Sequence, residues 1–260
     1  EPQSTPPPQA PRAIRAASYD RTRISRPPCR CAGIIPRAVP ANRAHWKPER
    51  TMLKIEKMPL GPVVTNCFVI ADDDCDDCVV IDPAWDAPEI LGRVSARGWK
   101  LRAIWLTHAH FDHFGGVAGI MQQHPGLPLG LHRLDLPMYR VGGGAQAWGI
   151  PVDCSHEPTL WWEQTESVRL GRFQFSVMFV PGHSPGHVAF YHAESDSLFG
   201  GDVLFQQGIG RTDLPGGDHA ELLSSIRTHF LPLPEDTMVY CGHGDDTTIG
   251  AEKRANPFLV

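Results

Sequence analysis

From residue 52 onward, short apolar segments alternate with stretches of helical periodicity. The apolar runs have strand length and predict strands at 63–70, 78–81, 101–106, 127–131, 168–170, 173–180, 188–191, 197–199 and 238–241. Helices are predicted at 87–97, 117–123 and 219–230, where Gly98 can end the first helix and Asp218 can cap the last. This alternation predicts an α/β fold.

The first fifty residues have a different composition from the rest of the chain. They hold ten of the 24 lysines and arginines, only three of the 29 acidic residues, and ten of the 25 prolines. Because they show no sustained apolar period, we expect residues 1–51 to be a disordered Arg/Pro-rich extension and residues 52–260 to form the folded domain. Two origins stay open for the extension, an organellar transit peptide or additional upstream sequence.

The overall composition argues against several classes of function. A formal net charge of −5 and a pI near 6.2 leave no basic footprint for nucleic acid. No apolar run approaches the roughly 20 residues that a membrane helix needs.

The seven cysteines lack a regular spacing, which indicates a reducing compartment, so we expect the cytoplasm, or an organelle if the extension is a transit peptide. The Cys75-x-x-Cys78 pair lies in an acidic run that is typical of a solvated loop.

The segment that follows the predicted strand 101–106 contains a dense group of metal-binding side chains. His108, His110, Asp112 and His113 place three imidazoles and a carboxylate within six residues. Packing gives no reason to crowd such groups, whereas imidazole and carboxylate are ligands that zinc, iron and manganese accept. The segment therefore predicts a metal site at a strand end.

Three later strand ends each carry a further potential ligand beside glycine. These ligands are His183, Asp202 and His243. Glycine lets the backbone turn sharply and approach a bound group closely. The seven donors together can serve two ions if one carboxylate bridges them, which predicts a dinuclear hydrolytic site.

These motifs resemble those of the metallo-β-lactamase superfamily and, within it, the glyoxalase II-like hydrolases. The matching stretches are Thr-His-Ala-His-Phe-Asp-His-Phe-Gly-Gly, Pro-Gly-His-Ser-Pro-Gly-His, Gly-Asp-Val-Leu-Phe and Cys-Gly-His-Gly. The resemblance implies an αββα sandwich of two mixed β-sheets flanked by helices. It assigns one ion to His108, His110 and His183, the other to Asp112, His113 and His243, and a bridging position to Asp202. It gives Asp82 a role in supporting the first loop rather than in touching metal.

The same resemblance implies an activity. Only 17 residues follow His243, which is similar to the short single-domain branch that lacks the glutathione-binding helical domain. We expect a metal-bound hydroxide to attack a thioester carbonyl, most naturally in a hydroxyacylglutathione-type small molecule, with Asp112 and Asp202 as catalytic residues. We expect two divalent ions, zinc first and iron or manganese as alternatives. The sequence leaves the oligomeric state open.

Two further residues and three other functions complete the expectations. His187 is expected to support a metal ligand, by hydrogen-bonding its carboxylate, rather than to be an eighth ligand itself. Arg211 is expected either to bind an anionic substrate or to form a surface salt bridge. The competing functions are a persulfide dioxygenase with a single ferrous ion, a lactone or β-lactam hydrolase, and a metal-stabilised binding module without catalysis. The complete second ligand set argues against the single iron, and a site rich in oxygen donors argues against a closed structural metal.

Overall fold

Two six-stranded sheets form the centre of the protein. The computed structural model describes residues 52–164 and 166–260. The first sheet has the order β1-β2-β3-β4-β5-β6, with the strands β1 (Lys54–Leu60), β2 (Thr65–Asp72), β3 (Asp77–Ile81), β4 (Lys100–Trp105), β5 (Leu129–Leu131) and β6 (Leu160–Trp161). Its first three strands pair antiparallel and its last four pair parallel, so the sheet is mixed.

The second sheet has the order β14-β13-β10-β9-β8-β7 and is also mixed. Its strands are β7 (Ser167–Leu170), β8 (Phe173–Phe179), β9 (Val188–His192), β10 (Ser197–Gly201), β13 (Met238–Cys241) and β14 (Thr247–Thr248). Strands β10 and β13 run parallel, and the other pairs run antiparallel. A short ribbon of β11 (Leu204–Phe205) and β12 (Gly208–Ile209) follows β10.

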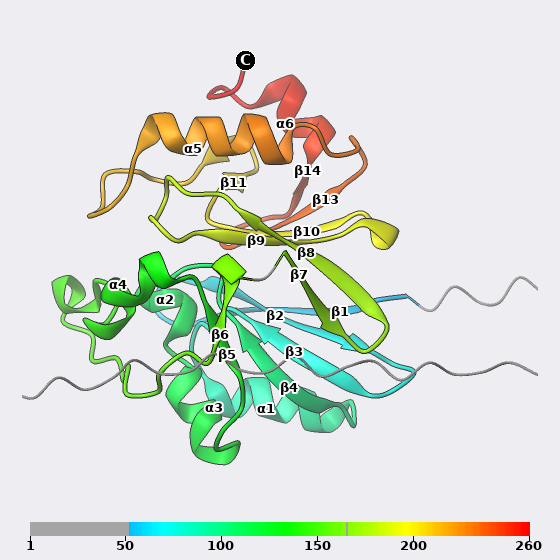
Figure 1. Ribbon diagram of the computed structural model, residues 1–260, viewed down its shortest axis with the longest axis vertical. Coiled ribbons are helices and arrows are strands. Elements are labelled where there is room, and N and C mark those ends of the chain that lie inside the picture. The colour runs from blue at the N-terminus through cyan, green and yellow to red at the C-terminus, as the bar shows by residue number, and fades with distance from the viewer. Residues whose placement is uncertain (1–51, 165) are drawn as a thin grey trace, which may run out of the picture. The chain divides into compact units, whose positions relative to one another are not determined.

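Helices cover the outer faces of both sheets (Figure 1). Helices α1 (Ala87–Ala96) and α3 (Val117–Gln123) lie on the first sheet, while α5 (His219–Ser225) and α6 (Ile249–Ala255) lie on the second. The Asp218 carboxylate caps the start of α5 by accepting the Glu221 N–H at 2.9 Å. A π-helical segment (Ile226–Phe230) extends the other end of α5. Two short helices, α2 (Phe111–Phe114) and α4 (Leu136–Arg140), lie at one edge near the junction of the sheets. The predicted αββα sandwich is thus confirmed.

An aromatic cluster fills the space between the sheets. Trp105 from β4 lies 5.4 Å from Phe175 and 5.2 Å from Phe190 of the opposite sheet, measured between ring centroids. Trp162 packs edge-on against Trp105 and donates its indole N–H to the Leu106 carbonyl at 2.9 Å. These rings fix the two sheets face to face, which sets the position of every loop at the sheet edges.

Most predicted elements are present, with some differences in their bounds. The strand predicted at 63–70 begins at Thr65, and that predicted at 127–131 is confined to Leu129–Leu131. Strand β1 and helix α6 were not predicted, because their mixed polar sequences lack a strong apolar period. The proposed 1–51 extension lies outside the described residues.

The acidic Cys75-x-x-Cys78 loop is only partly solvated. Cys78 is buried in β3, which matches the strand predicted at 78–81, and Cys75 is half-buried, so the prediction of a solvated loop does not hold for Cys78. Within the described ranges, no helix combines the length and apolarity required to cross a bilayer.

The inter-sheet cluster predicts a large cost for truncating its central ring. We expect Trp105→Ala to lower the free energy of unfolding by about 3–5 kcal/mol, because a buried ring is replaced by a cavity between rigid sheets. Denaturant unfolding of the purified protein measures this loss. Phe258→Ala, at a side chain that is 49% exposed, is the control and is expected to change stability by less than about 0.5 kcal/mol. Equal effects of the two substitutions would contradict the proposed role of the cluster.

Candidate metal centre

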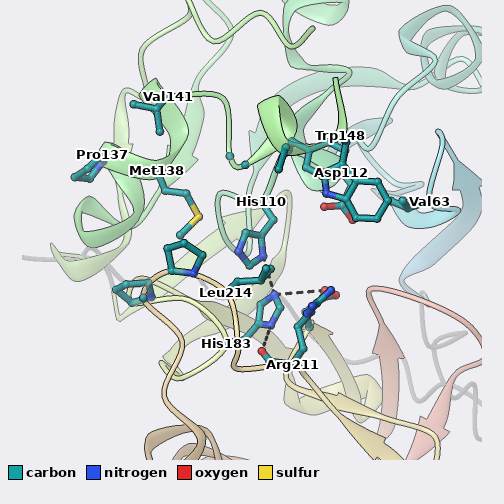
Figure 2. Close-up of a pocket in the computed structure, with 18 of the residues that line it drawn as sticks. Val63, His110, Asp112, Pro137, Met138, Val141, Trp148, His183, Arg211 and Leu214 are labelled. Carbon is teal, nitrogen blue, oxygen red and sulfur yellow. Dashed lines mark hydrogen bonds and ion pairs between the residues drawn. The ribbon is translucent and has the colours of Figure 1, made fainter. Parts of the chain in front are cut away.

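All seven predicted donors converge at one edge of the sandwich. The loop after β4 and the start of α2 supply four of them, and the ends of β8, β10 and β13 supply one each: His108, His110, Asp112, His113, His183, Asp202 and His243. Six of these side chains are buried, and His243 is partly exposed. Figure 2 shows His110, Asp112 and His183 facing a common space.

The first group of donors consists of His108, His110 and His183, whose candidate ligand atoms lie within 4.8 Å of one another. Nδ1 of His110 is 2.8 Å from Nε2 of His183. His183 donates its Nδ1–H to the Arg211 carbonyl at 2.8 Å, which leaves Nε2 unprotonated and directed toward the group. This is the tautomer that a metal ligand needs.

The second group consists of Asp112, His113 and His243, again within 4.8 Å. Oδ2 of Asp112 is 3.1 Å from Nε2 of His243 and 3.5 Å from Nε2 of His113. A hydrogen bond of 2.8 Å from the Thr65 hydroxyl orients the same carboxylate oxygen. The second group therefore matches the first in size and offers an anionic ligand that the first group lacks.

Asp202 lies between the two groups. Its Oδ2 atom is 3.5 Å from Nε2 of His183 in the first group and 3.5 Å from Nε2 of His243 in the second. Its Oδ1 atom is 3.4 Å from Nε2 of His113. A carboxylate in this position can reach cations held by either group.

The electrostatics of the site favour cations. Burial lowers the pKa of His110 to about 3 and holds the pKa of His108 well below its usual value, so both rings are neutral near pH 7. Burial opposes the charge on His243, but hydrogen bonds to Asp112 and Asp202 outweigh it and raise the His243 pKa to about 9. Burial likewise opposes the Asp112 charge, but neighbouring His113 overcomes it and lowers the Asp112 pKa to about 2. Two ionised carboxylates thus lie among imidazoles in a largely dry site.

Several donor atoms are buried without a hydrogen-bond partner, which tests whether metal ions fit. Within the described part of the chain these include Nε2 of His108, Nε2 of His113 and Oδ1 of Asp202. Leaving buried polar atoms unsatisfied costs about 1–3 kcal/mol each. Because all three atoms belong to the donor set and its nitrogen and oxygen chemistry suits divalent transition metals, the residues fit such ions.

Asp82 supports the first loop from behind. Its carboxylate accepts hydrogen bonds from the Thr107 N–H, the Thr107 hydroxyl and Nδ1 of His113 at 2.7–2.9 Å. The Thr107 oxygen lies 3.0 Å from Nδ1 of His108 and, because its O–H donates to Asp82, it accepts that ring's N–H. Asp82 therefore directs Nε2 of both His108 and His113 into the site, although Asp82, His108 and His113 also lie close enough to form a third potential group.

Two glycines next to the ligands are required by close approach. A Cβ atom at Gly242 would overlap Oδ1 of Asp202 and lie 2.9 Å from Cε1 of His113. Gly201 has a positive φ of 52°, and a Cβ there would lie 2.7 Å from the Thr107 hydroxyl. The glycines that flank the ligands thus leave space for the donor side chains.

The structure distinguishes between the roles expected of His187 and Arg211. His187 is buried and stacks on His108 at 4.7 Å, but its Nε2 accepts the backbone N–H of Asp202 at 3.1 Å. His187 thus supports the donor residue Asp202, as expected of a partner rather than an eighth ligand, but it bonds the Asp202 main chain and not the expected carboxylate. The Arg211 guanidinium pairs with Asp213 through two hydrogen bonds of 2.7 Å, which is the salt-bridge alternative, while its carbonyl orients His183.

Sequence reasoning missed the residues that hold the ligand loops together. Asp135 is fully buried, and its carboxylate accepts the Ala109 N–H at 3.0 Å, the Ser184 hydroxyl at 2.7 Å and the Gly186 N–H at 2.6 Å. It therefore joins the loop of His108 and His110 to the loop of His183. A lone aspartate in the sequence Arg-Leu-Asp-Leu-Pro carries no signal of this role.

Asn66 plays a similar part for the last ligand. Its side-chain amide donates to the carbonyls of Cys241 at 2.8 Å and Gly244 at 3.0 Å, on either side of His243. A buried polar residue at the start of an otherwise apolar strand is the one signal that could have indicated it.

The contacts of Asp135 predict that replacing one of its carboxylate oxygens will weaken the link between the ligand loops. Asp135→Asn replaces an acceptor with an amide that faces N–H and O–H donors, so we expect a loss of about 1–3 kcal/mol in unfolding free energy and weaker metal binding. Thermal unfolding and metal titration measure both effects. Asp153→Asn is the matched control, because exposed Asp153 also accepts a backbone N–H, from Ser155 at 2.9 Å, yet lies apart from the ligand loops. Unchanged metal affinity in Asp135→Asn would contradict the role of Asp135.

Comparisons with known proteins agree with this geometry. Residues 60–243 match the model of the metallo-beta-lactamase superfamily. Hydroxyacylglutathione hydrolase GloC of Haemophilus influenzae is 41% identical over 210 residues, which cover 80% of this chain and 98% of that protein. The crystal structure of the B3 metallo-beta-lactamase BLEG-1 is 42% identical with a TM-score of 0.75, covering 79% of this chain and 99% of that one. The crystal structure of TTHA1623 in a di-iron-bound form is 41% identical with a TM-score of 0.71, and the match covers 78% of this chain and 100% of that one. Fold, donor set and sequence thus place this chain in the metallo-beta-lactamase superfamily.

Proposed function

We propose that this protein is a dinuclear metal-dependent hydrolase that cleaves a thioester. The observation that carries the proposal is the position of Asp202 between two three-residue groups of donors, His108, His110 and His183 on one side and Asp112, His113 and His243 on the other. Two ions bound there would supply a water molecule activated near neutral pH and a Lewis acid for a carbonyl group.

The side chains around the site perform separate tasks in this proposal. Asp112 is held by Thr65 and stays ionised, so its free oxygen can accept a hydrogen bond from the attacking water and orient it. Asp202 lies within 3.5 Å of a donor nitrogen in each group and can therefore contribute to both ions. The leaving thiolate needs little protonation, because an ordinary thiol has a pKa of about 8.5, so a site without an evident general acid suits a thioester.

The relatives support a hydrolase and guide the choice of substrate and metal. A hydroxyacylglutathione hydrolase is among the similar proteins, which makes a hydroxyacylglutathione thioester the reference substrate. Zinc is the metal we propose, with iron and manganese as alternatives, since the donors accept all three and one similar structure holds two irons. We propose a small-molecule substrate, no nucleic-acid or membrane partner, and a cytoplasmic location, or an organelle if residues 1–51 are a transit peptide.

One alternative has specific support. The likeness to a B3 metallo-beta-lactamase favours β-lactam hydrolysis as the second candidate, because the same ions would activate water toward an amide carbonyl. A persulfide dioxygenase with one iron would leave Asp112, His113 and His243 without a use.

The test combines elemental analysis with a substrate panel. The full chain, loaded separately with zinc, iron or manganese, is offered a hydroxyacylglutathione thioester, a lactone, a β-lactam and glutathione persulfide with an oxygen electrode. We expect close to two ions per chain and the highest kcat/KM on the thioester. One iron per chain with oxygen consumption on the persulfide would overturn the proposal.

Removing the central carboxylate should affect both ions. We expect Asp202→Ala to reduce the bound metal below two ions and to lower kcat by about a hundredfold or more, because both groups lose a shared ligand. Atomic absorption and steady-state kinetics measure these changes. Asp236→Ala removes an exposed carboxylate and should change neither quantity. Full metal content and full activity in Asp202→Ala would rule out a bridging role.

A further inference from the structure

A cavity of about 860 Å³ opens from the candidate metal centre and is lined mainly by apolar side chains. His110, Asp112, His183, Asp202 and His243 form its inner end. Its volume lies within the range of about 300–1,000 Å³ that is usual for small-molecule sites. A substrate whose carbonyl meets the metal centre must therefore place the remainder of its structure along this cavity.

The connection between β5 and β6 supplies most of the apolar wall. Leu134, Met138 and Val141 lie around helix α4, and Trp148 ends the 3₁₀ helix η2 (Ala145–Trp148). Leu214, from the loop before α5, contributes from the second half of the chain. Figure 2 shows Met138 and Val141 on one side of His110 and Trp148 on the other.

These apolar side chains are unusually exposed. Val141 is 75% exposed, Trp148 is 61% exposed and Leu134 is 55% exposed, although most large apolar side chains in the described part of the chain are buried. Apolar side chains gathered at a cavity mouth gain free energy when an apolar ligand removes them from water. Because these side chains line the same cavity as the metal ligands, the ligand that covers them is expected to be part of the substrate.

The cavity offers little to a highly charged substrate. Of the described residues that line it, Arg211 is the only lysine or arginine, and its guanidinium already pairs with Asp213. A tripeptide thiol such as glutathione carries two carboxylates and an ammonium group, which bind best to oriented charged partners. The wall thus suits a chain of carbon atoms better than it suits that tripeptide.

We propose that the substrate carries an apolar chain of several carbons next to its scissile thioester, and that Trp148, Met138 and Val141 bind this chain. The proposal rests on the thioester hydrolase function proposed above and specifies its substrate class. The chain can belong to the acyl group or to the thiol, since the cavity wall presents the same chemistry to either.

Two series of thioesters test this proposal on the full, metal-loaded protein. One series keeps N-acetylcysteamine as the thiol and lengthens the acyl group from acetyl to octanoyl; the other keeps acetyl and lengthens an alkanethiol from ethyl to octyl. In at least one series we expect kcat/KM to rise about twofold to fourfold for each added methylene until the cavity is filled. The best member should exceed acetylglutathione by about tenfold or more.

Variants assign the effect to the wall. Trp148→Ser combined with Val141→Ser should flatten the dependence on chain length, and these exposed positions tolerate the change without loss of folding. Phe258→Ser, another exposed apolar side chain but outside the cavity, should keep the dependence of the unaltered protein.

The possible failures are distinguishable. If thioesters are hydrolysed but both series are flat, or glutathione thioesters remain preferred, the apolar-chain proposal is overturned and the hydrolase function stands. A dependence on chain length that persists in the double variant overturns the assignment to this wall. If no thioester is hydrolysed at all, the proposed function and this inference both fail.

Discussion

The buried carboxylates of Asp112 and Asp202 are the groups on which the rest of the site depends. An ionised carboxylate out of contact with water is costly unless positive charge compensates it. Here Nε2 of His113 and Nε2 of His243 lie within 3.5 Å of these carboxylates, which raise the pKa of both rings. Divalent cations bound among these donors would compensate the same negative charge, which gives metal binding its driving force.

Such an arrangement survives only on a rigid support. The aromatic rings around Trp105 lock the two sheets together, and four loops from both sheets meet at the resulting edge. Asp82, Asp135 and Asn66 then connect these loops through buried hydrogen bonds. The connecting residues bond backbone groups, side-chain hydroxyls and a ring nitrogen of the ligand loops, so the donors are oriented before any ligand arrives.

The same support separates the chemistry from substrate selection. The ligands lie on loops that follow sheet strands, whereas most of the apolar wall comes from the connection between β5 and β6. Apart from Asp135, which bonds the ligand loops, the side chains of this connection can change without moving the metal ligands, because none of them belongs to the donor groups. Members of one superfamily can therefore act on different carbonyl compounds with one constellation of donors.

The sequence by itself determined the seven donors, the α/β class and most strands, because clustered ligands beside glycines and strand-length apolar runs are local signals. It did not reveal β1, α6 or the role of Asp135, since their meaning depends on partners far along the chain. Only the tertiary structure decided that His187 meets the backbone of Asp202, that Arg211 pairs with Asp213, and that one wall of the site is apolar. These contacts arise where separate segments of the chain pack together in the sandwich, and the residue spacing within any one segment does not determine that packing.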